Sequence, residues 1–302
     1  MLKTICHSLV LVIMKKAVKK LIPNILKEFA KKILDVFDRK IFPISKPFIL
    51  EDCLGVRFIF YQWNRGMIRT LLERNDLKKE ILAIKKLIKK DDIVFDAGAN
   101  IGILSAVYSH LVGNNGKVYS FEPISETFFQ LKETLALNRC DNAIPIKIAL
   151  SDKHGSAEMQ IFDKSLSGLS SLAKPEYPAY NSTSVPIKTE TLDNICAEFR
   201  ITGIDFLKID VEGFEKEVLA GAGELLKNNM IKFIQFEISD APLTASGKTP
   251  EDVVNVLKKY NYSVFSFDLA TKRFNGPIST IKQKKGGYDN FYSSQLNLSA
   301  IQ

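Results

Sequence analysis

Apolar runs and helical repeats alternate through the middle of the chain. Short apolar runs predict buried strands at residues 93–96, 118–121, 144–150, 204–210 and 233–238. Apolar positions spaced three and four residues apart predict amphipathic helices at residues 76–90, 101–111, 126–137, 214–228 and 250–260. Buried strands that alternate with helices favour a parallel sheet, with helices on both faces and right-handed crossovers between the strands. The pattern therefore predicts an α/β fold.

Strand-like segments also stand at the two ends of this alternation. Residues 55–61 read as a strand before the first helix. Residues 262–267 and 290–292 alternate like strands, and a segment rich in glycine and proline separates them. Such a pair predicts a C-terminal antiparallel hairpin that is added to the edge of the sheet.

A long connection interrupts the alternation between residues 151 and 192. It contains strand-like stretches at residues 157–162 and 185–189, on either side of a polar stretch at residues 164–184. Connections of this length are commonly functional. A lid over a bound acceptor and a plain flexible loop are both compatible with the pattern.

The first 48 residues predict a separate helical extension. The apolar run at residues 5–14 is too short to span a bilayer, which takes about 20 residues, and no signal-peptide cleavage site follows it. From Val18 onward, apolar residues recur at helical spacing with lysines between them. This basic amphipathic helix is suited to lie on an anionic membrane surface, or to pack on the body or on a second subunit. We expect residues 49–302 to form the main domain.

Charge is concentrated in the same extension. The chain carries 42 Lys and Arg against 34 Asp and Glu, and ten of the basic residues but only three of the acidic ones lie within residues 1–40. The remainder is nearly neutral, which argues against a nucleic-acid-binding protein. The four cysteines lie far apart without metal-ligand spacing, which favours a reducing, cytoplasmic setting. Residues 1–40 then offer the only expected membrane contact, a peripheral one.

The turn after the first predicted strand has the composition of a cofactor site. Residues 96–102 read DAGANIG, and they include Asp96, Gly98, Asn100 and Gly102. Ligands of open α/β sheets bind beyond the carboxyl ends of the strands, and glycines allow a tight turn and a close approach. The dinucleotide pattern GxGxxG is absent. The turn therefore favours a nucleoside ligand, although a packing turn without ligand would also satisfy the sequence.

Polar residues after the next two strands fit the same ligand. Glu122 ends the second strand, where its carboxylate could accept hydrogen bonds from the two hydroxyls of a ribose. Ser151 and Asp152 follow the third strand, where a hydroxyl and a carboxylate could recognise an adenine amino group. Asp152 also suits an ordinary turn.

Several motifs in succession resemble the FkbM family of S-adenosylmethionine-dependent methyltransferases. They are AGANIG, SFEP, ALSD, TLDNI, FLKIDVEGFEKEVLAGA and IQFE, and the similarity extends over residues 79–292. The resemblance implies a Rossmann-like class I methyltransferase fold with a seven-stranded, mostly parallel sheet. It also implies S-adenosylmethionine as cofactor and O-methylation of a hydroxyl on a sugar, glycan or other small metabolite. Asp96, Gly98, Asn100 and Gly102 match the family's cofactor turn, and Glu122 matches its ribose-binding acid.

The fourth predicted strand supplies the candidate catalytic groups. A hydroxyl acceptor needs a base to take its proton, and carboxylates are the better candidates in a chain with three histidines. Lys208, Asp210 and Glu212 are two residues apart, so an extended chain would present them on one side. Asp210 is the expected base, Glu237 of the fifth strand could complete the wall, and Lys208 would orient the acids. A structural salt-bridge cluster is the alternative. A divalent metal ion held by Asp210 and another carboxylate also remains open, although the spacing alone does not support one.

Two other functions remain compatible with these patterns. One is a nicotinamide-dependent oxidoreductase on a similar sheet, although the missing glycine at position 103 argues against it. The other is a non-catalytic, membrane-associated module that binds a nucleoside. The acceptor, its methylated atom and the oligomeric state are left open by the sequence.

Overall fold

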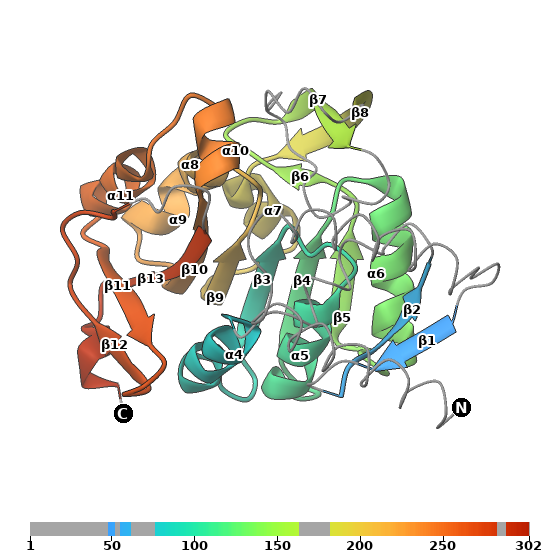
Figure 1. Ribbon diagram of the computed structural model, residues 1–302, viewed down its shortest axis with the longest axis horizontal. Coiled ribbons are helices and arrows are strands. Elements are labelled where there is room, and N and C mark those ends of the chain that lie inside the picture. The colour runs from blue at the N-terminus through green and yellow to red at the C-terminus, as the bar shows by residue number, and fades with distance from the viewer. Residues whose placement is uncertain (1–47, 52–54, 62–75, 163–181, 283–287, 302) are drawn as a thin grey trace, which may run out of the picture. The chain divides into compact units, whose positions relative to one another are not determined.

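The computed structural model describes residues 48–51, 55–61, 76–162, 182–282 and 288–301 (Figure 1). The predicted N-terminal extension lies outside these residues except for Phe48, and most of the polar stretch at residues 164–184 lies outside them too. Within the described part, no helix is both long enough and apolar enough to cross a membrane.

The main sheet has eight strands among the described residues, in the order β12-β11-β13-β10-β9-β3-β4-β5. Neighbouring strands from β5 to β10 run parallel, and β13 runs antiparallel to both β10 and β11. This order confirms the predicted mostly parallel α/β sheet. Its strands are β3 (Ile93–Ala97), β4 (Lys117–Phe121), β5 (Ala143–Ile146), β9 (Ile204–Ile209), β10 (Ile231–Ser239), β11 (Ser263–Asp268), β12 (Arg273–Asn275) and β13 (Tyr288–Ser294).

The C-terminal strands form the predicted antiparallel pair at one edge of the parallel strands. β11 and β13 pair antiparallel, and β13 is inserted between β10 and β11. The edge is formed by the short strand β12, which pairs antiparallel with β11 and makes an eighth strand. The insertion brings the start of β13 beside the end of β10.

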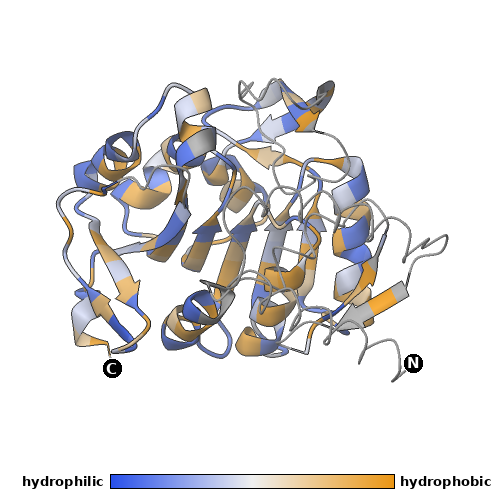
Figure 2. Cartoon of the chain, in the orientation of Figure 1, coloured by the Kyte–Doolittle hydropathy of each residue, from blue (hydrophilic) through white to orange (hydrophobic). Residues whose placement is uncertain are grey.

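Helices cover both faces of the sheet, as the apolar pattern predicted. Buried residues of α4, α5 and α6 pack on one face with Val94, Val118 and Phe206, whereas residues of α7, α8, α9 and α11 pack on the other with Phe95 and Leu207. Figure 2 shows much apolar colour on the central strands and mixed colours on the helices. The helices are α4 (Asp76–Leu87), α5 (Ile103–Val112), α6 (Ser125–Leu137), α7 (Leu192–Glu198), α8 (Glu215–Ala220), α9 (Gly223–Lys227), α10 (Asp240–Ala245) and α11 (Pro250–Lys259).

The third predicted strand, residues 144–150, is wrong as a single element. Its first part is β5 of the main sheet, and its last two residues form β6 (Ala149–Leu150) of a separate three-stranded sheet. In that sheet β6 pairs with β8 (Ser182–Glu190), which pairs antiparallel with β7 (Gly155–Phe162). A further two-stranded sheet joins β1 (Phe48–Glu51) to β2 (Arg57–Phe60).

The helix predicted at residues 214–228 is interrupted. It forms α8 and α9, with Gly221 and Ala222 between them. A side chain at Gly221 would place its Cβ 2.0 Å from the carbonyl oxygen of Ser151. The break therefore coincides with close packing of this segment against the chain that follows β6.

Candidate active site

The parallel strands align one polar residue each across the face that α4 and α5 cover. The register places Ser120 of β4 beside Asp96 of β3, Asp96 beside Lys208 of β9, and Lys208 beside Gln235 of β10, which pairs with Tyr292 of β13. All five are at most 4% exposed. We call these five residues the polar row, and it leads from the first strand toward the C-terminal strands.

The turn between β3 and α5 lies at the carboxyl edge, directly above the polar row. The amide groups of Gly98 and Ala99 donate to the carbonyl of Phe121, which ties the turn to β4. Asn100 and Gly102 have φ values of +50° and +86°. The helix therefore begins at Ile103 rather than at the predicted residue 101.

Gly98 brings this turn against the end of β9. Its φ is +79°, and an added Cβ would lie 1.9 Å from the carbonyl oxygen of Asp210. The amide of Asp210 also donates to the carbonyl of Ala97 over 3.0 Å. The predicted cofactor turn and the predicted base are thus joined through the backbone.

Glu122 is a buried carboxyl group that directly follows β4. It is 6% exposed, and its two carboxylate oxygens accept hydrogen bonds from the amides of Asn100 (3.1 Å) and Ile124 (2.9 Å). Each oxygen keeps further lone-pair capacity for a ribose hydroxyl. Burial raises the pKa of Glu122 to about 7, although the two amide hydrogen bonds oppose the shift.

This pKa predicts pH-dependent binding of a ribose-containing ligand. The ionised carboxylate is the stronger hydroxyl acceptor, and its fraction rises from about one tenth at pH 6 to about nine tenths at pH 8 for a pKa near 7. The affinity for S-adenosylhomocysteine should therefore increase about five- to tenfold between pH 6 and pH 8 in calorimetric titrations. Glu122→Gln should bind more weakly and show a flat profile. A wild-type affinity that does not change over this range would contradict the prediction.

Ser151 and Asp152 lie where β6 ends. Ser151 is 8% exposed and its hydroxyl donates to a carboxylate oxygen of Asp152 over 3.1 Å, while Asp152 is exposed. The amide of Ser151 donates to the carbonyl of Glu190 in β8. Asp152 is therefore oriented by its neighbour and accessible to a ligand.

Lys208 lies between Asp96 of β3 and Asp210 at the end of β9. Its ammonium lies 3.0 Å from a carboxylate oxygen of Asp210 and 3.8 Å from one of Asp96, whose other oxygen accepts 2.6 Å from the Ser105 hydroxyl. Burial alone would lower the pKa of Lys208, but Asp210, Asp96 and Glu80 outweigh it and hold that pKa above its ordinary value. The side chain of Asp210 keeps 30% exposure, so this carboxylate is both fixed and accessible.

Removing the Lys208 charge should destabilise the fold strongly. Lys208→Met leaves the carboxylates of Asp96 and Asp210 without their cation, and breaking a buried ion pair in this way costs about 3–5 kcal/mol. The free energy of unfolding in urea should fall by this amount. Lys117→Met, at an exposed position of β4, is the matched control and should change it little. Equal effects of the two substitutions would contradict the role given to Lys208.

Of the predicted catalytic acids, Glu212 is placed differently from the expectation and Glu237 is not. Strand β9 ends at Ile209, and Glu212 has a φ of +52°, so the extended spacing that was to align Glu212 with Lys208 and Asp210 is wrong. Glu237 is 8% exposed and lies two residues before the end of β10. It pairs with Asn290 of β13.

Three polar residues of this region were not predicted from the sequence, namely Glu80, Gln235 and Asn290. The Gln235 amide donates to Glu80 of α4 over 2.5 Å and to the side-chain oxygen of Asn290 over 3.1 Å. A lone glutamine inside the apolar strand IQF was the available signal for Gln235. Glu80 was overlooked because the helix was interpreted only by its apolar face and its lysines.

One of the three histidines, His154, directly precedes β7 of the small sheet. It is 77% exposed and contacts Glu190 of β8 over 2.6 Å. Among the described residues, no group of three or more His, Cys, Asp or Glu side chains is arranged to hold a metal ion.

The sequence itself matches a known family over more than half of its length. Residues 96–264 match the model of the methyltransferase FkbM domain, which covers the cofactor turn, Glu122 and the end of β9. The chain belongs to the FkbM methyltransferase family. Membership confirms the resemblance and identifies the chain as an S-adenosylmethionine-dependent methyltransferase. The oxidoreductase and the non-catalytic binding module are not supported.

Three FkbM-type relatives show the range of the similarity. The hexuronic acid methyltransferase AglP of Haloferax volcanii is 27% identical over 191 residues, covering 62% of this chain and 72% of that protein. The 2-O-methyltransferase NoeI of Sinorhizobium fredii is 26% identical, covering 56% and 72%. The 31-O-demethyl-FK506 methyltransferase FkbM of Streptomyces tacrolimicus is 30% identical, covering 44% and 60%.

Proposed function

We propose that this FkbM-type methyltransferase methylates a hydroxyl oxygen on a sugar, a glycan or another small hydroxylated acceptor. The observation that carries the proposal is the position of Asp210. Its carboxylate is partly exposed and is held by buried Lys208. Its backbone carbonyl packs against Gly98 of the cofactor turn. An acceptor bound there would meet a fixed base beside the cofactor.

The residues at the carboxyl edge suit the groups of S-adenosylmethionine. Glu122 offers two carboxylate oxygens to the ribose hydroxyls, and Asp152 offers an acceptor to the adenine amino group. The left-handed turn at Asn100 and Gly102 lets the backbone approach a ligand closely. When bound, the cofactor supplies a sulfonium methyl group that is open to in-line displacement.

Asp210 is assigned the proton transfer. A hydroxyl is a weak nucleophile at neutral pH, and a carboxylate within hydrogen-bond reach takes its proton as the new bond forms. Lys208 restricts the carboxylate to one orientation, and such positioning is a large part of the rate enhancement of bimolecular reactions. Glu237 and Glu212 are proposed to border the acceptor rather than to act as the base.

The names of the relatives support oxygen as the methylated atom. NoeI and FkbM are named for methylation at numbered oxygens, and AglP is named for a hexuronic acid. Among these three names, that of AglP states a sugar class and the other two state the oxygen. We therefore assign an O-methyl product to this chain.

Transfer of an isotope-labelled methyl group tests the proposal. The purified chain is incubated with methyl-labelled S-adenosylmethionine and a panel of sugars and amines, and the products are examined by NMR. A labelled methyl ether is the expected product. A labelled N-methyl product, or no transfer to any hydroxyl by a chain that binds S-adenosylhomocysteine, would overturn the assignment to oxygen.

A further inference from the structure

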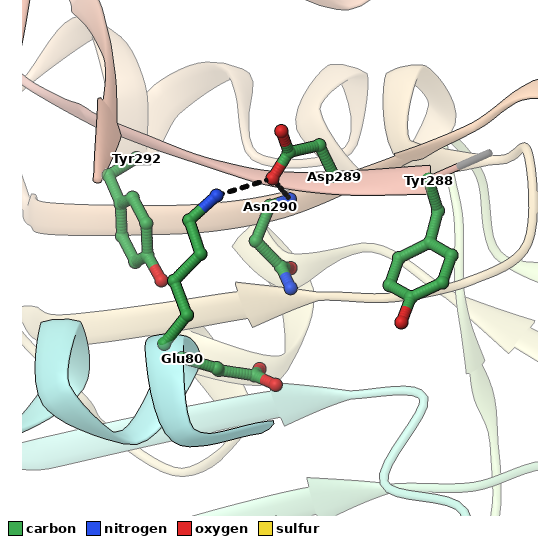
Figure 3. A pocket seen from close by; sticks show the side chains of 6 residues that line it. Glu80, Tyr288, Asp289, Asn290 and Tyr292 are labelled. Carbon is green, nitrogen blue, oxygen red and sulfur yellow. Dashed lines mark hydrogen bonds and ion pairs between the residues drawn. The ribbon is translucent and has the colours of Figure 1, made fainter. Parts of the chain in front are cut away.

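A small hollow lies between the start of α4 and the start of β13 (Figure 3). It measures about 20 Å³, which is room for one water molecule or one substituent of a larger ligand. A whole sugar ring would have to lie over it. Its lining residues are Lys79, Glu80, Tyr288, Asp289, Asn290 and Tyr292.

The wall of the hollow contains a polar atom that lacks a partner. The Tyr292 side chain is fully buried, and its hydroxyl has no hydrogen-bond partner among the described residues. Gln235 does not line the hollow, but its amide donates to the lining residue Asn290. Buried polar groups are normally hydrogen-bonded, so the unpaired Tyr292 hydroxyl in the lining points to a polar occupant.

The strand register of the sheet places the hollow close to the proposed base, Asp210. Asn290 pairs with Glu237 across β13 and β10. Glu237 and Asp210 each follow directly after the paired residues Phe236 and Ile209 of neighbouring strands. Glu237 lies two residues after Gln235 in β10, and Asn290 lies two residues before Tyr292 in β13, so both side chains lie on the face of the polar row. The Asp210 carboxylate contacts Lys208 of the same row. An acceptor over Asp210 could therefore extend one substituent into the hollow.

The charges around this position are mainly negative. Carboxylates are supplied by Glu80 and Asp289 in the hollow and by Asp210 and Glu237 beside it. The cations are already engaged, because Lys79 lies 2.8 Å from Asp289 and Lys208 lies 3.0 Å from Asp210. A further carboxylate would be repelled, whereas a hydroxyl can donate to these oxygens.

We propose that the hollow is an acceptor subsite that takes one hydroxyl-bearing substituent of a sugar without a carboxylate. This inference rests on the proposed function and adds a preference to it. The uncharged ring is favoured over the corresponding uronic acid, and Asn290 and Asp289 set that preference. This preference distinguishes the chain from AglP, which is named for a hexuronic acid.

A matched pair of ligands tests the preference. Methyl β-D-glucopyranoside and methyl β-D-glucopyranosiduronate differ only in a hydroxymethyl group against a carboxylate. Their affinities for the full chain saturated with S-adenosylhomocysteine are measured by NMR titration. The glucoside should bind about five times more tightly than the uronate, the ratio expected for about 1 kcal/mol of charge repulsion.

Two variants shift the charge of the hollow in opposite directions. Asn290→Asp adds a negative charge and should widen the ratio further. Asp289→Asn leaves Lys79 without its acid and should narrow or reverse the ratio. Asn255→Asp adds the same charge at an exposed position of α11 and should leave the ratio unchanged.

Each remaining outcome overturns either the subsite or the proposed function. Equal or tighter binding of the uronate overturns the subsite. Binding that neither hollow variant alters means that the hollow holds water only, and it also overturns the subsite. If S-adenosylhomocysteine binds but neither sugar does, the subsite fails and the cofactor assignment stands. If S-adenosylhomocysteine does not bind, the proposed function fails as well.

Discussion

Asp210→Asn should lower the rate of methyl transfer about 10²- to 10⁴-fold, the range lost when a general base is removed. The substitution keeps the shape of the side chain but removes the proton acceptor. The affinity for S-adenosylhomocysteine should change little, because the asparagine leaves Glu122 and the cofactor turn untouched. Single-turnover measurements with labelled S-adenosylmethionine and calorimetric titration give the two quantities.

The control for this prediction lies on the same strand. Asp205 accepts a hydrogen bond from the amide of Ile93 at the other end of β9. Asp205→Asn should lower stability without changing the transfer rate of the folded enzyme. A fall of less than tenfold for Asp210→Asn, or equal falls for both variants, would mean that Asp210 is not the base.

Gly98→Ala should have the largest effect on stability and cofactor binding of the glycine substitutions. Its Cβ would lie 1.9 Å from the backbone oxygen of Asp210, so the turn and the end of β9 would have to separate. We expect a loss of at least about 4 kcal/mol in the free energy of unfolding, the range of exceptional single substitutions. The folded fraction should also lose affinity for S-adenosylhomocysteine.

Gly247→Ala isolates the clash from the cost of the backbone conformation. Gly247 has a φ of +69°, similar to the +79° of Gly98, but an added Cβ there meets nothing within 4 Å. The conformational cost alone is about 1–2 kcal/mol. If urea unfolding gives the same loss for both variants, the close approach between the turn and Asp210 does not exist.

The strands of the fold were largely predictable because burial leaves a local signal. β3, β4, β9 and β10 begin and end within two residues of the predicted runs, since both faces of a central parallel strand are apolar. The run at residues 144–150 was misassigned because two short strands of different sheets follow one another within it. The break at Gly221 depends on packing against Ser151, which is distant in the sequence.

The candidate site was predictable where its residues follow strands. The closeness of Asp96, Glu122 and Asp210 could be predicted because the carboxyl ends of parallel strands meet at one edge. The positions of Gln235 and Glu80 could not be predicted, since they come from the strand register and from a helix that packs over the sheet. The expectation for Glu212 assumed an extended chain, and the left-handed conformation at that residue is set by the turn it enters.

The most direct test of the account is a calorimetric titration with S-adenosylhomocysteine and with NADH. It is performed on the full chain, on Glu122→Ala and on Asp210→Asn. The account predicts that S-adenosylhomocysteine binds the wild type and Asp210→Asn with similar affinity, that Glu122→Ala loses this binding, and that NADH does not bind. Failure of the folded wild type to bind S-adenosylhomocysteine, or a preference for NADH, would contradict it.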